Sequence, residues 1–140
     1  MPHAISEGDR RFERAFEALD IAPSDFDHAA HVRLAYIYLC QHAPDEANAR
    51  MKRALLAFVD HLGVGRSKFH ETMTHAWILA VRHFMDQTPH STSADAFLAA
   101  NPRLLDTKIM FRHYSVERLF SQTAREAYLP PDLAPIPVHG

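Results

Sequence analysis

Apolar residues recur three and four positions apart along most of this chain, and this spacing restricts its fold more than any other feature. Sustained alternation of apolar and polar residues, the mark of β-strands, never occurs. The spacing predicts four longer helices, over residues 9–19, 24–41, 45–62 and 67–85. Pro44 and Gly63 bound the third of these as typical start and stop residues. Three longish helices joined by short connections favour antiparallel neighbours.

The C-terminal third predicts shorter elements. One helix is expected from a Ser93 cap to residue 100, another after Pro102, and a last one from a Ser115 cap to residue 128. Residues 129–140 are rich in proline and predict an extended tail. The expected fold is therefore all-α: a single domain over 1–140, built as an up-and-down helical bundle of three to four main helices with short C-terminal helices.

Composition narrows the classes of function. Hydrophobic residues make up 47% and charged residues 23%, which is ordinary for a globular domain. A net charge of −2 with scattered basic residues argues against a nucleic-acid partner. No apolar run is long enough for a membrane span, and residues 1–20 lack the pattern of a signal peptide, so the cytoplasm is the expected location. The lone Cys40 excludes an internal disulfide.

Histidine is unusually frequent, with 11 residues in 140, and two of them lie three positions apart in the motif Phe26-x-His28-x-x-His31. On a helix this spacing places both imidazoles on one face, one turn apart. Leu34 and Tyr38 follow on the apolar side of the same helix, so we expect His31 to point into the bundle.

The second motif is Phe69-His70-Glu71-Thr72-x-Thr74, with His75 directly after it. His70 shares a helical stripe with Thr74, which predicts an inward position, whereas Glu71 lies at the edge of that stripe. Buried polar groups without partners are costly, so inward histidines on two helices indicate a shared partner.

Two kinds of chemistry fit these residues. His28, His31, His70 and Glu71 could bind Zn²⁺ or a non-haem Fe²⁺, with one position left open. Without a metal, His70 and Glu71 could act as a proton carrier and a base, with Thr74 grouped beside them. The order His-Glu-x-x-x-His does not match the His-Glu-x-x-His motif of zinc proteases.

Structural roles compete with these readings. His28 could serve as a capping or packing residue, and His70 and Glu71 could serve the N-terminal turn of their helix. His75 is expected to be structural or exposed, and His3, His42, His61, His83, His90 and His139 are expected on the solvated surface. The geometry of Asp106, Arg112 and Tyr114 relative to the main site cannot be read from the sequence.

The two motifs also give the chain a resemblance to a family of small bacterial all-helical proteins of unknown function. Further matching segments are Asn101-Pro102-x-Leu104-Leu105-Asp106, Tyr114-Ser115 and Pro130-Pro131-Asp132-Leu133, so the resemblance spans about residues 25–137. It implies a shared polar site at His28, His31, His70, Glu71 and Thr74, and supplies no chemistry. Phe69 stands where the family pattern has tyrosine.

Three functions remain open at this point. The first is a small enzyme with a His/Glu site inside the bundle, with or without a divalent metal, acting on a small polar molecule. The second is a non-catalytic module or sensor that binds a small ligand or a metal ion. The third is a helical interaction subunit whose useful surface lies elsewhere. The expected partner is a small molecule, and a homodimer is compatible with all three functions.

Overall fold

The computed structural model describes residues 3–140, and in that part of the chain helices are the regular elements, without any β-strand. The α-helices are α1 (Glu7–Glu17), α2 (His28–Gln41), α3 (Pro44–Leu62), α4 (Glu71–Asp86), α5 (Ala94–Ala100), α6 (Val116–Leu119) and α7 (Gln122–Glu126). The 3₁₀-helices are η1 (Pro23–Asp25), η2 (Arg66–Lys68), η3 (Pro102–Leu105) and η4 (Thr107–Arg112). The all-α class is confirmed. The up-and-down order and the extent of the domain, which includes residues 1 and 2 outside the described part, stay predictions.

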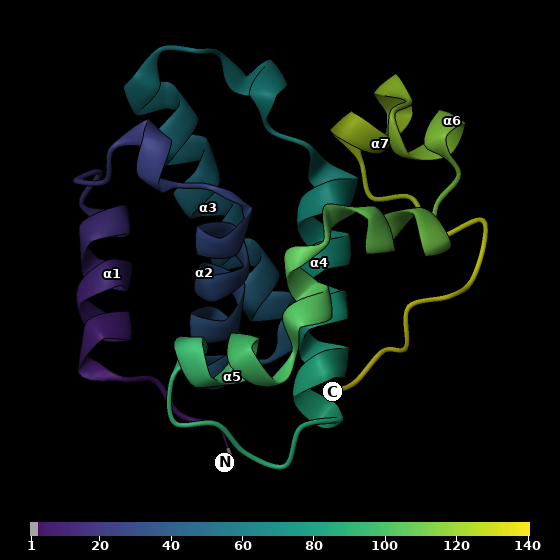
Figure 1. Ribbon diagram of the computed structural model, residues 1–140. Coiled ribbons are helices and arrows are strands. Elements are labelled where there is room, and N and C mark those ends of the chain that lie inside the picture. The colour runs from purple at the N-terminus through teal and green to yellow at the C-terminus, as the bar shows by residue number, and fades with distance from the viewer. Residues whose placement is uncertain (1–2) are drawn as a thin grey trace.

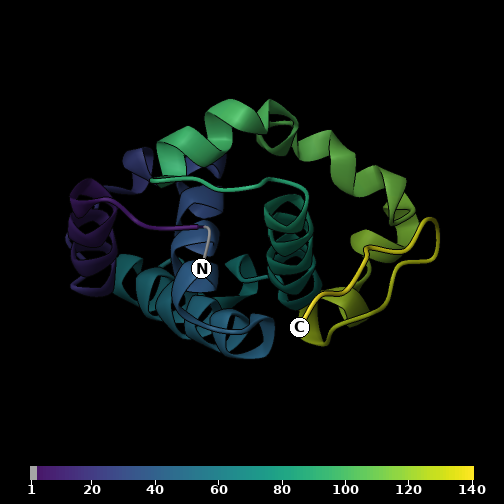
Figure 2. The same ribbon diagram turned by 90° about the horizontal axis from the view of Figure 1, so that it is seen from below.

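Helices α2, α3 and α4 form the centre of the molecule and contact one another more extensively than any other elements (Figure 1). From Val32 to Leu39 almost every side chain of α2 is buried, because α1, α3, α4 and α5 cover it on several sides. A helix that is apolar around its whole circumference is typical of such a central position. Seen from below, α5, η3 and η4 form an arch along one side of α2 and α4 (Figure 2).

The predicted boundaries of α3 agree with the structure. Pro44 occupies the first turn, Asp45 and Glu46 follow it, and Gly63 ends the helix with a positive φ of 68°. Acidic residues in the first turn stabilise the positive end of the helix dipole, and glycine adopts the left-handed conformation without steric cost.

Other boundaries differ from the prediction. Helix α1 begins at Glu7, because the Ser6 side chain accepts a hydrogen bond from the Asp9 amide in a capping box. Ser67 lies in η2 and caps no helix, and α4 begins only after His70. The helix predicted to follow Ser115 is two short ones, because the Ser121 side chain caps a new helix at Gln122.

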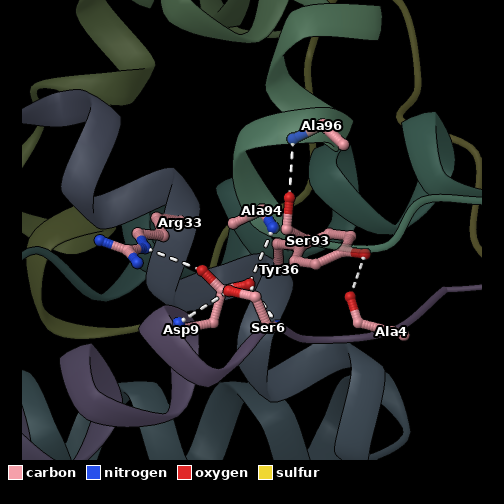
Figure 3. Close-up of polar contacts among 8 residues, drawn as sticks. All are labelled: Ala4, Ser6, Asp9, Arg33, Tyr36, Ser93, Ala94 and Ala96. Carbon is pink, nitrogen blue, oxygen red and sulfur yellow. Dashed lines mark hydrogen bonds and ion pairs between the residues drawn. The ribbon is translucent and has the colours of Figure 1, made fainter.

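The N-terminal segment is anchored by a buried polar cluster (Figure 3). The carboxylate of Asp9 accepts hydrogen bonds from the Ser6 and Ala94 amides and from Arg33. Burial raises the pKa of Asp9, but these hydrogen bonds and the charge of Arg33 outweigh it, so the pKa is lowered. Asp9 thus joins α1, α2 and α5 as a carboxylate.

His3 was expected on the surface and is buried, so that prediction is wrong. Its Nδ1 lies 2.6 Å from the Ser91 hydroxyl and its Nε2 donates to the carbonyl of Met85 at 2.8 Å. An isolated bridge with Ser91 holds the same segment. The sequence contained no local signal for this, since both partners are more than 80 positions away.

The proline-rich tail returns to the body of the molecule and ends beside α4 (Figure 2). Its amides at Leu133 and Ala134 donate to the carbonyls of His113 and Arg112. Ile136 is buried. The tail therefore contains no helix and forms part of the packed structure.

Candidate functional site

A cavity of about 450 Å³ lies where the first turns of α2 and α4 face the C-terminal half of α3. We call it the His31 cavity. Four of the residues predicted from the sequence line it: His28, His31, His70 and Thr74. Most of its remaining wall is apolar, formed by Phe26, Leu55, Phe58, Val59, Leu62, Phe69 and Met73. His31 and His70 thus line the same space.

His28 is held by a neighbour distant in sequence. Asp27 caps α2 by accepting from the Ala30 amide, which fixes the first turn and directs His28 toward η3. The Nε2 of His28 donates to the Leu104 carbonyl at 2.9 Å, and the ring lies edge-on to Trp77 with centroids 4.6 Å apart. A carbonyl only accepts, so Nε2 carries the hydrogen. The Nε2 side of the His28 ring therefore has a structural role, since it is held by Leu104 and packs against Trp77.

His31 lies one turn further along α2, and its Nε2 is buried without a hydrogen-bond partner. Among residues 3–140 only one other buried side-chain polar atom, in Asn48, is in the same condition. Burial, followed by the charge of His28, lowers the pKa of His31 from 6.5 to about 4. The imidazole is therefore neutral near pH 7.

His70 has the opposite environment. It is the N-cap of α4, where its Nδ1 accepts from the Met73 amide at 3.0 Å. Its Nε2 donates to the Leu119 carbonyl at 2.7 Å. Burial lowers the pKa of His70, the bond to Leu119 opposes this, and Arg125 lowers it again. Both ring nitrogens are occupied, in agreement with the N-terminal structural role that the sequence left open.

Glu71 does not reach the His31 cavity. Its carboxylate forms an ion pair with Lys52 at 2.7 Å and lines a separate hollow together with Arg125. Thr74 is buried on the cavity wall. His75 lies outside the cavity against the ring of Tyr128, with centroids 4.1 Å apart, and burial lowers its pKa.

The predicted metal ligands are not gathered around one point. His70 has no free nitrogen and Glu71 is held by Lys52, which leaves His28 and His31 of the set. Within residues 3–140 no three histidine, cysteine or acidic side chains are placed to bind one ion. These donors do not fit a Zn²⁺ or Fe²⁺ centre, which requires about three protein ligands.

The sequence did not reveal several residues that shape the site. Leu55, Phe58 and Met73 line the cavity, and helical spacing alone does not distinguish a cavity wall from a filled interior. Thr72 fixes the loop after α7 by donating to the Ala127 carbonyl and accepting from the Leu129 amide. Tyr114 donates to the Leu129 carbonyl, so both residues hold the chain after α7 and neither lines the cavity.

The remaining candidates lie apart from this site. Asp106 caps η4 through the Lys108 amide, and Arg112 lines a different cavity.

Comparison of the chain with protein-family models, curated proteins and solved structures finds no match in any of the three. In residues 3–140, the helices fall short of the length and apolarity needed to cross a bilayer. The function is therefore inferred from the geometry and chemistry of the chain itself.

Proposed function

We propose that this protein binds a small, mainly apolar molecule carrying one hydrogen-bonding group in the His31 cavity, without chemical conversion. The observation that carries the proposal is that His31 lines this space while its Nε2 is buried without a hydrogen-bond partner. An unpaired buried polar atom costs about 1–3 kcal/mol, and a ligand that supplies the missing partner recovers part of that cost. Because the Nε2 of His31 has no hydrogen bond in the free protein, a rotation of the imidazole toward a ligand would break none at that atom.

The lining favours a neutral ligand. The wall is mostly apolar, and the two charged residues that line the cavity, Asp27 and Lys68, have opposite signs. A hydroxyl group both donates and accepts, so it can pair with His31 in either neutral tautomer. A small alcohol or phenol with an apolar body therefore matches this site.

Proton transfer has less support than binding. A histidine with a pKa of about 4 is a weak base near pH 7, whereas efficient general bases have pKa values near the working pH. Glu71, the predicted base, is paired with Lys52 outside the cavity. The enzyme hypothesis would need a base that these residues do not supply.

A matched pair of ligands tests the proposal. In an amide NMR titration of the full chain, 4-ethylphenol should shift the first turns of α2 and α4. Ethylbenzene, which has the same apolar body without the hydroxyl, should bind about fivefold more weakly, since one hydrogen bond contributes on the order of 1 kcal/mol.

Two variants complete the experiment. His31→Leu should remove the difference between the two ligands, and His61→Leu, at an exposed position on α3 outside the cavity, should retain it. Equal affinities of both ligands for the unmodified protein, or shifts confined to other regions, would refute the proposal.

A further inference from the structure

A second cavity, of about 660 Å³, lies between the C-terminal half of α4, the η3–η4 segment and the tail. We call it the tail cavity. Its apolar surface includes Phe84, Met110 and Ile136, the last of which belongs to the returning tail. Figures 1 and 2 show the tail meeting α4 at this end of the molecule.

The permanently charged side chains that line the tail cavity are both positive. Arg103 and Arg112 contribute two guanidinium groups, and His83, His113, Gln87 and Asn101 contribute further polar groups. No aspartate or glutamate is among the described residues that line it. The carboxylate of Asp86 lies nearby and is 3.7 Å from Nδ1 of His139. The cavity therefore presents an excess of positive charge.

The two arginines have no carboxylate partner within residues 3–140, so their guanidinium charges are not neutralised by an ion pair there. The Arg103 guanidinium lies 5.7 Å from the centre of the Phe84 ring, which places a cation directly above the apolar floor. Guanidinium groups bind carboxylates through two parallel hydrogen bonds.

We propose that the tail cavity binds an amphipathic organic carboxylate, with its apolar body on Phe84, Met110 and Ile136 and its carboxylate at Arg103 or Arg112. Because Ile136 supplies one wall, an occupied cavity also holds the tail against α4. This site is separate from the His31 cavity, with which it shares no lining residue. The inference therefore stands independently of the function proposed above.

Three eight-carbon ligands that differ in charge test this inference: octanoate, 1-octanol and octylammonium. In amide NMR titrations of the full chain, octanoate should shift the amides of residues 83–87, Ala134 and Ile136. It should bind about tenfold more tightly than 1-octanol, and octylammonium should bind more weakly still, because the cavity is positive.

Variants assign the contribution of charge. Arg103→Gln and Arg112→Gln together should reduce the affinity for octanoate about tenfold and leave that for 1-octanol unchanged. Lys108→Gln removes a cation from η4 that does not line the cavity and should have little effect. Equal affinities for octanoate and octylammonium, octanoate shifts around His31, or full binding by the double arginine variant would each overturn the proposal.

Discussion

The two ends of the His31 cavity carry the same chemical group in opposite environments. At the start of α4, both nitrogens of His70 are bound by main-chain groups of Met73 and Leu119. At the start of α2, the Nε2 of His31 is buried with no partner. Burial is the largest influence on both pKa values and lowers each of them. Residue type, inward position and depressed pKa therefore do not distinguish a structural histidine from a ligand-binding one.

The distinction comes from counting partners. A neutral imidazole has one donor and one acceptor, and a residue that has used both has nothing left to offer a ligand. His70 satisfies that condition and stabilises the fold. His31 does not, and its burial is a cost that the rest of the protein offsets. Mutation of His70 should therefore reduce the stability of the fold, and mutation of His31 should change its dependence on pH.

The largest expected effect is at His70. His70→Ala removes the N-cap of α4, which contributes about 1 kcal/mol, and leaves the Leu119 carbonyl without its donor, which costs about 1–3 kcal/mol. The free energy of unfolding, measured with urea, should fall by about 3 kcal/mol.

His70→Asn is the matched variant for this position. Asparagine is a good N-cap but cannot reach Leu119 as the imidazole does, so it should recover about 1 kcal/mol of the loss. If His70→Ala unfolds at the same urea concentration as the unmodified protein, the structural role of His70 is wrong.

A smaller effect is expected from acidification acting on His31. Its pKa is about 4 in the folded protein and 6.5 for the unperturbed group, so between these pH values the unfolded chain binds a proton that the folded chain does not. Stability is therefore lost as the pH falls through this window, by about 2 kcal/mol between pH 7 and pH 5.

His31→Leu isolates this contribution. The pKa values of His70, His75 and His83 are also lowered, but these residues are present in both proteins and cancel in the difference. Urea unfolding at pH 7 and pH 5 should show a weaker pH dependence for the variant. An identical pH dependence in both proteins would mean that the Nε2 of His31 is not shielded from water.

Prediction from the sequence succeeded where the decisive interactions are local. Pro44 and Gly63 bound α3 through backbone conformation alone, and the three-residue spacing placed His28 and His31 on one face. The four residues His28, His31, His70 and Thr74 do line one cavity. Local pattern was thus sufficient for the all-α class and for part of the candidate site.

Prediction failed where a partner lies far along the chain. The role of His70 depends on the Leu119 carbonyl, 49 positions away, and His3 is buried through Met85 and Ser91. Lys52, which holds Glu71 away from the cavity, comes from another helix. Helical spacing gives the direction of a side chain but not the identity of the group that it meets.

The smallest expected effect is that of replacing Glu71, which belongs to the second sequence motif but lies outside the His31 cavity. The Lys52–Glu71 pair is partly exposed, with 46% of the lysine side chain accessible, and exposed ion pairs contribute about 0–1 kcal/mol. Glu71→Gln should therefore change the free energy of urea unfolding by less than about 1 kcal/mol. It should also leave the affinity for 4-ethylphenol unchanged, because Glu71 does not line the His31 cavity.

Lys52→Met, which removes the other member of the pair, should likewise change the free energy of unfolding and the affinity for 4-ethylphenol little. If Glu71→Gln alone greatly weakened binding of 4-ethylphenol, Glu71 would have to belong to the binding site, and the acid/base hypothesis would again be supported.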